Sequence, residues 1–303
     1  MISWQARTMK AYLRLQRIVS PPRRDLVVSK DRADLVAMAR LFKPMGRVDC
    51  QPVDAAGVPA ERIVPAGLTN GRTILYLHGG SFNAGSIETH RALAANLALA
   101  VGACTLLIDY RLAPEHPFPA ALQDAAAAYE WLIAKPTPPS SLILAGDSAG
   151  GGLVISLLLD LRDRRMPLPA MGVCLSPATD LTMSGASMRT NAAADLVPET
   201  RNIRQSVEIY LRRTDPHNPL ASPMFADLGG LPPLLLQVGS DEMLLSDSTE
   251  FAARAEAAGV KVSLQVWPHM QHVWQFAASF IPEGRQAIRD IAQFVERNIS
   301  ALG

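Results

Sequence analysis

Ser148 stands at the centre of residues 146–150 (Gly-Asp-Ser-Ala-Gly), a pattern that can make a serine hydroxyl nucleophilic. An apolar run at 141–145 precedes the pattern and another at 153–161 follows it, so the local order is strand, sharp turn and helix. The glycines permit a strained serine backbone, and the turn lifts the hydroxyl towards the positive end of the helix. This stretch predicts a nucleophile elbow and, with it, a serine hydrolase.

A chymotrypsin-like protease is the alternative, because Gly-Asp-Ser-Gly-Gly marks that class. In those enzymes the serine follows the histidine and the aspartate, on a disulfide-rich all-β barrel. Here Ser148 lies in mid-chain, a helix follows it, and the chain has three cysteines. The protease interpretation is therefore rejected.

A serine needs a base to remove its proton, and the base needs an acid to orient it. In α/β hydrolases the acid follows the serine and precedes the histidine. Asp241 comes directly after the strand predicted at 234–238, while Glu242 and Asp247 are neighbours that could substitute. We favour Asp241 because it lies nearer the strand end. His269 and His272 both follow the next strand, at 262–267, and the residues alone do not separate them.

The tetrahedral intermediate needs hydrogen-bond donors for its oxyanion. One is the amide of Ala149, directly after the nucleophile. The others are expected from the loop at 78–82 (His-Gly-Gly-Ser-Phe), which follows a strand at 73–77. The predicted donors there are Gly79, Gly80 and Ser81, and Phe82 is predicted to border the substrate pocket. All these residues follow parallel strands, whose carboxyl ends form the binding crevice of such sheets.

The remaining periodicity predicts an α/β fold with a mostly parallel sheet covered by helices on both faces. Two strands flank a turn at Ala56-Gly57, and further strands are expected at 103–108 and 171–175. Helices are expected at 90–101, 120–134, 248–258 and 283–299. Residues 1–45 are helical in pattern, and 183–213 interrupt the alternation as an insertion over the sheet.

Composition limits the function classes. A chain of 303 residues with 49% hydrophobic content can bury one large core, and a net charge of +1 favours neither nucleic acid nor an anionic membrane. Basic residues crowd the first 32 positions, where we expect a solvated helix face. The three cysteines suit buried free thiols in a reducing compartment. The sequence shows no signal-peptide pattern, no membrane-length apolar run and no metal or nucleotide motif, which favours a cytoplasmic enzyme without cofactor or metal.

With these motifs, the chain resembles the hormone-sensitive lipase family of bacterial carboxylesterases from about Val53 onward. The matching stretches are 109–120 (Asp-Tyr-Arg-Leu-Ala-Pro-Glu-His-Pro-Phe-Pro-Ala), 176–177, 180–182, 231–233, 239–242 and 270–272 (Met-Gln-His). The family's Met-x-His pattern favours His272 as the base. The family's third loop glycine is replaced here by Ser81. The resemblance implies that Asp147 is structural and that Asp109 with 111–119 braces the oxyanion loop.

The resemblance also implies an α/β-hydrolase fold with a helical cap made by residues 1–45 and 183–213, the catalytic domain spanning 46–303. Family members often pair through the last strand, so a homodimer is an expectation. The hypothesis is hydrolysis of short- to medium-chain carboxylic esters through an acyl-enzyme by Ser148, Asp241 and His272. Bulk at Ser81 and Phe82, and the lack of a large exposed apolar segment, favour short acyl chains over lipid.

Two other hypotheses use the same fold. Plant gibberellin receptors bind a small molecule without hydrolysing it, but they lack the catalytic histidine that His272 supplies here. A peptidase or amidase is the other, and comparison of an ester with the matching anilide separates it from an esterase.

Overall fold

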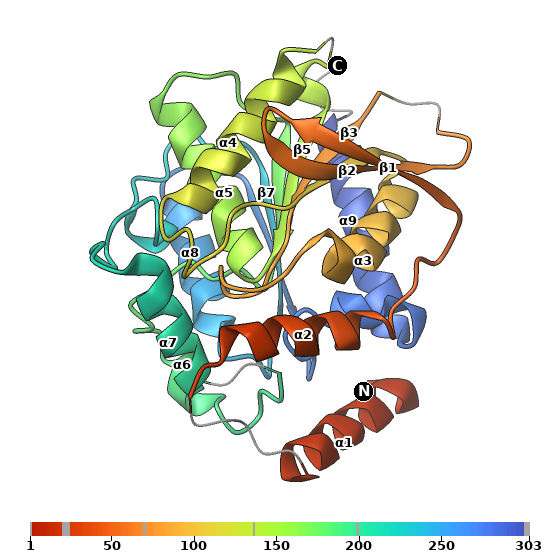
Figure 1. The fold of residues 1–303 in the computed structure, drawn as a ribbon, viewed down its shortest axis with the longest axis vertical. Coiled ribbons are helices and arrows are strands. Elements are labelled where there is room, and N and C mark those ends of the chain that lie inside the picture. Colours follow the sequence, from red (N-terminus) through yellow and green to blue (C-terminus); the bar gives the residue numbers. More distant parts are fainter. Residues whose placement is uncertain (1, 20–24, 69–70, 136, 198–199, 300–303) are drawn as a thin grey trace.

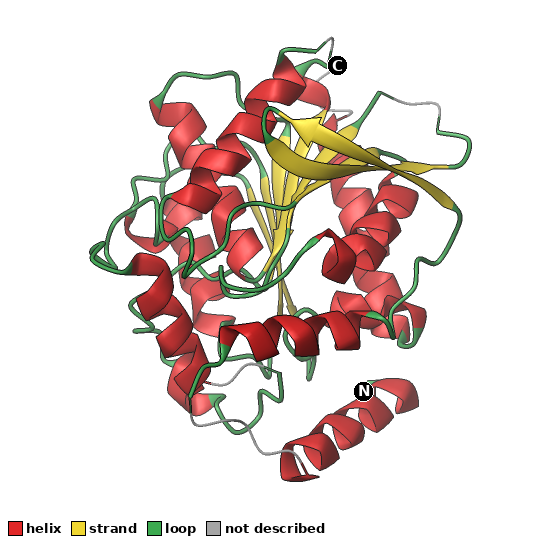
Figure 2. Ribbon diagram, viewed as in Figure 1, coloured by secondary structure: helices red, strands yellow, loops and turns green. Residues whose placement is uncertain are grey.

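One twisted sheet forms the centre of the molecule (Figure 2), and the computed structural model describes residues 2–19, 25–68, 71–135, 137–197 and 200–299. Within these residues the strand order is β1-β2-β4-β3-β5-β6-β7-β8. β2 is antiparallel to β1 and β4, and the other neighbours are parallel. The strands are β1 (Val48–Ala55), β2 (Val58–Pro65), β3 (Thr73–Leu77), β4 (Cys104–Ile108), β5 (Leu142–Asp147), β6 (Met171–Leu175), β7 (Leu234–Gly239) and β8 (Val262–Trp267). The predicted mostly parallel sheet is confirmed.

Helices cover both faces of the sheet because successive strand residues point to opposite sides. Leu75 and Leu77 belong to a core cluster with α4 (Ala120–Ile133), α5 (Ala149–Asp163) and α8 (Leu245–Ala257). Ile74 and Tyr76 belong to a second cluster with α3 (Ile87–Val101) and α9 (Pro282–Ile299). Figure 1 shows these two groups of helices on opposite sides of the strands. The α/β-hydrolase prediction therefore holds at the level of layers.

The register of the parallel strands brings the predicted functional loops to one edge. Leu77 is level with Gly146, Gly146 with Cys174, and Cys174 with Leu236. The chain leaves these strands at neighbouring positions, so the loops after β3, β5, β6 and β7 start side by side.

The start of α3 differs from the prediction by three residues, and a capping box explains the difference. Ser86 accepts a hydrogen bond from the Thr89 amide, and the Thr89 hydroxyl accepts one from the Ser86 amide. The helix therefore begins at Ile87 rather than His90. Threonine at this position replaces the usual glutamate or glutamine, so the signal was weak in the sequence.

Four helices lie outside these layers. They are α1 (Trp4–Val19), α2 (Val28–Ala39), α6 (Ser187–Thr190) and α7 (Thr200–Leu211). In Figure 1, α1 and α2 lie beside the lower end of the sheet, with α6 and α7 close to α2. These are the segments that the sequence analysis expected to form a cap.

One expectation about the surface was wrong, and a second holds in part. The helix α1 exposes large apolar side chains, among them Trp4 (70% exposed), Ile18 (77%) and Val19 (72%). Of the basic residues in the first 32 positions, Arg7, Arg14 and Lys30 are exposed as expected, whereas Lys10 and Arg32 form ion pairs with Asp241 and Glu115. In the described part of the chain, no helix combines the length and the apolar character needed to cross a membrane.

The backbones of β3 and α5 lie close together at the elbow, and this leads to a prediction about stability. A Cβ at Gly150 would lie 2.1 Å from the carbonyl oxygen of Leu77 and 2.5 Å from that of His78. We expect Gly150→Ala to lower the free energy of unfolding by about 1–3 kcal/mol, because the strand and helix must move apart. The measurement is the urea unfolding midpoint.

Gly71→Ala is the matched control, since a Cβ at Gly71 meets no atom within 4 Å. Its midpoint should equal that of the wild type within error. Equal midpoints for the two variants would show that the close contact at Gly150 is unimportant.

Candidate active site

Ser148 occupies the predicted elbow between β5 and α5, with a backbone φ of 54° and ψ of −121°. This left-handed conformation is costly for a residue with a side chain. Hydrogen bonds hold it in place: the Ser148 amide donates to Leu175 O (2.7 Å), and the Ser148 carbonyl accepts from the amides of Gly152 and Ala178. The backbone of Ser148 is thereby fixed at the start of α5.

His272 lies in the loop after β8, and its partner is Glu242. Nδ1 of His272 is 2.8 Å from Oε2 of Glu242, and the side chains are 10% and 0% exposed. The second carboxylate oxygen, Oε1, accepts hydrogen bonds from the Gly239 amide (2.6 Å) and from the Ser176 hydroxyl (2.8 Å). The carboxylate is thus held from both sides, and it orients the imidazole.

The electrostatics of this pair favour protonated His272. Burial alone would lower the pKa of the imidazole, but the hydrogen bond and the negative charge of Glu242 outweigh it and raise the pKa above its ordinary value. The negative charge of Glu242 stabilises the form of the imidazole that has accepted a proton, and general-base chemistry requires such stabilisation.

Asp241, the predicted acid, points elsewhere, and this part of the prediction is corrected. Its Oδ2 forms an ion pair with Lys10 Nζ at 2.5 Å, and its Oδ1 lies 3.7 Å from Nδ1 of His269. Consecutive residues of the turn after β7 point in opposite directions, so Glu242 faces His272 while Asp241 faces α1. Closeness to the strand end was the wrong criterion.

Asp247, the other alternative, supports a loop. It is buried, and it accepts hydrogen bonds from the amides of Thr179 and Asp180. Burial raises the pKa of this carboxyl to about 7. Asp247 therefore shapes the loop after β6.

Not all the predicted donor amides in the loop after β3 are available to an oxyanion. The Gly79 amide donates to Oδ1 of Asp147 (3.1 Å) and lies 3.2 Å from Nε2 of His90, so it is not free for an oxyanion. Gly79 is corrected to a structural residue. The amides of Gly80, Ser81 and Ala149 donate to no acceptor within the part of the chain that the structure describes.

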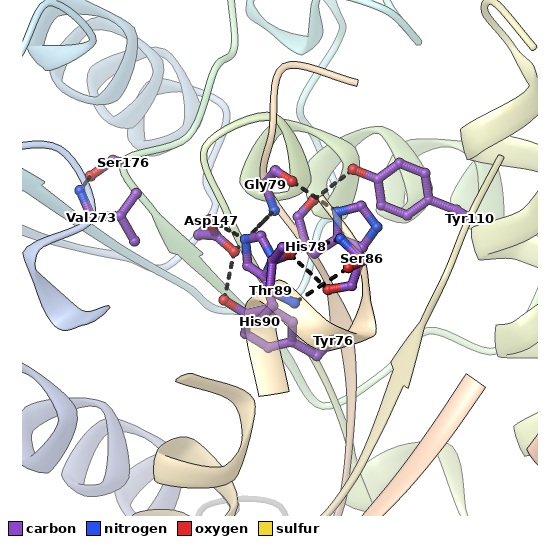
Figure 3. A network of polar contacts seen from close by, with 10 residues as sticks. All are labelled: Tyr76, His78, Gly79, Ser86, Thr89, His90, Tyr110, Asp147, Ser176 and Val273. Atoms are coloured by element: carbon purple, nitrogen blue, oxygen red, sulfur yellow. Dashed lines mark hydrogen bonds and ion pairs between the residues drawn. The ribbon is translucent and has the colours of Figure 1, made fainter. Parts of the chain in front are cut away.

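A buried network below the elbow fixes this loop (Figure 3). Oδ1 of Asp147 also accepts a hydrogen bond from the Tyr76 hydroxyl (2.7 Å), and Oδ2 lies 3.3 Å from His90 Nε2. Nδ1 of His90 contacts the Thr89 hydroxyl at 2.7 Å. Burial alone would raise the pKa of Asp147, but His90 and Tyr76 lower it below the ordinary value. Asp147 is charged, and it ties the elbow to the loop that carries Gly80 and Ser81.

The stretch after β4 contacts the same loop from the other side. The Tyr110 hydroxyl donates to His78 O (2.6 Å), its ring stacks on the His78 ring at 4.1 Å, and the Ala113 amide donates to Phe82 O. Burial and the neighbouring His90 lower the pKa of His78 to about 3, so this histidine is neutral. Asp109 accepts a hydrogen bond from the Ile87 amide and thereby holds the start of α3.

A cavity of about 300 Å³ joins the pieces. Ser148, Ala149, Gly80, Ser81 and His272 border it together with Phe82, whose ring stacks on Tyr210 at 3.8 Å. His90, Asp147 and Gln271 also border the cavity, but most of the remaining lining is apolar. The helices outside the sheet layers contribute Met9, Leu13, Leu35, Met38, Ile203 and Val207 to it. Within the described residues, no group of three or more His, Cys, Asp or Glu side chains could hold a metal ion.

Sequence reasoning did not identify Ser176 and His90 as parts of the site. Ser176 precedes a proline and has a positive φ of 46°, which is an unusual conformation for a serine and reflects its role beneath Glu242. His90 lies inside a helix, and nothing in its local sequence separates it from a solvated histidine. Its partner Asp147 is 57 residues away in the chain.

Comparison with known proteins identifies the family of the chain. The family model of the alpha/beta hydrolase fold matches residues 74–276. An acetyl-hydrolase of Streptomyces hygroscopicus is 46% identical over 263 residues, which cover 86% of this chain and 88% of that protein. An esterase of Acinetobacter venetianus is 37% identical and covers 91% of both chains.

Solved structures extend the similarity to the whole fold. The crystal structure of an esterase from the bacterial hormone-sensitive lipase family has a TM-score of 0.93 and 42% identity, and the alignment covers 99% of each chain. The crystal structure of EstE5 soaked with p-nitrophenyl butyrate has a TM-score of 0.94 and 41% identity, and the alignment covers 98% of this chain and 99% of that one. The chain therefore belongs to the α/β-hydrolase fold family and, within it, to the hormone-sensitive lipase group of esterases.

Proposed function

We propose that the protein is a carboxylesterase that hydrolyses short- to medium-chain carboxylic esters through an acyl-enzyme. The observation that carries the proposal is the buried His272–Glu242 pair, which borders the same cavity as the elbow serine. The nucleophile, base and acid are Ser148, His272 and Glu242, in the chain order of this fold. The names of the relatives support the same activity class.

In the first half of the reaction, Nε2 of His272 accepts the Ser148 proton as Oγ attacks the ester carbonyl carbon. The carbonyl oxygen becomes an oxyanion, which the amides of Gly80, Ser81 and Ala149 stabilise by donating hydrogen bonds. When the tetrahedral intermediate collapses, the bond to the alcohol oxygen breaks and His272 returns the proton to that oxygen. The alcohol leaves, and Ser148 keeps the acyl group.

In the second half, water replaces the alcohol. His272 accepts a proton from the water as its oxygen attacks the acyl carbon, and the same amides stabilise the second oxyanion. Collapse breaks the bond to Ser148 Oγ, which regains the proton from His272. Throughout, Glu242 keeps Nδ1 of the imidazole protonated and stabilises its positive form.

Substrate size follows from the shape of the site. Phe82 is buried against Tyr210, so the wall next to Ser81 has little freedom to move. A mainly apolar cavity of about 300 Å³ suits the hydrophobic part of a small ester. The proposed cap of helices α1, α2, α6 and α7 would limit how much of a long chain enters.

The function is tested with a series of p-nitrophenyl esters from acetate to palmitate. We expect kcat/KM to be highest at short to medium acyl length and about tenfold or more lower for palmitate, because methylenes that do not fit add strain without burial. Ser148→Ala should reduce turnover on the order of a millionfold.

A maximum at palmitate would indicate a lipase instead. Equal activity on a nitroanilide would indicate an amidase, and binding of esters without turnover by the wild type would favour a receptor.

The acid is tested by a matched pair of isosteric variants. Glu242→Gln should lower kcat for an acetyl ester by about 10³–10⁴-fold, because the base loses the charge that stabilises its protonated form. Asp241→Asn changes the same charge one residue away and should alter that kcat by less than about threefold. His272→Ala should be severe and His269→Ala mild. A larger loss in Asp241→Asn than in Glu242→Gln would restore Asp241 as the acid.

The raised pKa of His272 gives the pH dependence. Because the neutral imidazole accepts the serine proton, kcat/KM should fall as pH decreases through an apparent pKa above the ordinary histidine value of 6.5. Glu242→Gln removes the negative charge and should move this pKa to lower pH. Initial rates between pH 5 and pH 9 measure both values. An unchanged or higher pKa in the variant would argue against the pair.

A further inference from the structure

Polar contacts hold α1 along its length, and few of its side chains are buried. Within Trp4–Val19, all of which the structure describes, Ala6 is the one buried residue. At the start of the helix, Ser3 donates from its amide and its hydroxyl to Glu283 (2.6 and 2.8 Å). In the middle, Lys10 pairs with Asp241, and near the end Arg17 donates to Asp195 O (2.9 Å).

The Lys10–Asp241 pair is the contact closest to the catalytic loops. Its side chains are 12% and 17% exposed, and Lys10 Nζ also donates to His269 O (3.4 Å). Asp241 is fixed in turn, since its amide donates to Met270 O (3.4 Å) and its Oδ1 accepts from the Ser240 hydroxyl (3.0 Å). The pair therefore joins α1 to the loop of Glu242 and to the loop of His272.

What α1 contributes to the site is apolar surface. Met9 and Leu13 border the catalytic cavity opposite Leu35 and Met38 of α2. Met9, Leu13 and Met38 also border a wider groove between α1 and α2, so the two spaces adjoin. Met9 and Leu13 are half-buried, and Met9 also packs against the cluster that contains Trp274, so both side chains keep surface that borders these spaces. An apolar chain bound there would bury them and complete the packing of α1.

We propose that Lys10 and Asp241 are positioning residues that set chain-length selectivity, because their ion pair holds Met9 and Leu13 where the apolar chain of the ester binds. The inference rests on the proposed esterase function. An acetyl ester has too short a chain to depend on this wall. A longer chain gains about fourfold in affinity for each methylene buried against it.

Breaking the pair should displace α1. Lys10→Met leaves the Asp241 carboxylate without its cation, and Asp241→Asn leaves the ammonium without its anion, in a place with little access to water. We expect each change to lower the ratio of kcat/KM for octanoate to that for acetate by about tenfold or more, mainly through KM. Acetate turnover should stay within about threefold of the wild type.

The control is Arg14→Met, which removes the same charge from an exposed position of the same helix. It should leave the octanoate-to-acetate ratio unchanged. The double variant Lys10→Met with Asp241→Asn should show no greater loss than either single variant, because one interaction is removed in all three. Lys10→Arg keeps the charge and should recover most of the ratio.

The proposal is overturned if the ratio is unchanged in Lys10→Met and Asp241→Asn, if acetate and octanoate activities fall together, or if Arg14→Met has the same effect. Calorimetric binding of 1-octanol provides a readout without hydrolysis. Its affinity should fall about tenfold in Lys10→Met but not in Arg14→Met. If the wild type hydrolysed no ester, the proposed function would fail, while octanol binding would still decide the role of the pair.

Discussion

The strained backbone of Ser148 is the constraint on which the site depends. It requires that strand and helix meet without intervening side chains, and a Cβ at Gly146 or Gly150 would lie 2.7 or 2.1 Å from the carbonyl oxygen of Leu77. The same closeness brings Asp147 under the loop after β3, where a Cβ at Gly79 would lie 2.3 Å from the carboxylate. Nucleophile and proposed oxyanion donors are thus parts of one packed unit, and neither can be moved alone.

Two buried carboxylates, Asp147 and Glu242, have different electrostatic roles around this unit. Asp147 is surrounded by donors from Tyr76, Gly79 and His90, so its charge is used to hold backbone in place. One carboxylate oxygen of Glu242 accepts hydrogen bonds from the Gly239 amide and the Ser176 hydroxyl, and the other contacts Nδ1 of His272. Both carboxylates have the hydrogen-bond partners that a buried charge requires. The partner of Glu242 is the residue that we propose exchanges a proton with the substrate.

Local sequence was sufficient where periodicity and turn chemistry decide the structure. The bounds of β3, β6 and β8 agree with the prediction to the residue, and the elbow lies where its glycines indicate.

Prediction failed where the structure depends on contacts between residues distant in the chain. Asp241 and Glu242 are adjacent carboxylates after one strand. Asp241 differs from Glu242 because it pairs with Lys10, which is 231 positions away in the chain. Gly79 is predicted as a donor because it belongs to the glycine-rich loop after β3, but its amide turns towards Asp147. Neither partner is visible in a local pattern.

The small buried surface of α1 has a consequence for how the protein responds to heat. Segments with few buried side chains open locally at a free energy well below that of global unfolding. α1 has Ala6 alone buried within Trp4–Val19, whereas α5 buries nearly its full length against the sheet. On warming, α1 should therefore detach while the sheet is intact, and the apolar wall of the cavity would be lost first. Discrimination between substrates would then disappear at a lower temperature than the circular dichroism of the folded core.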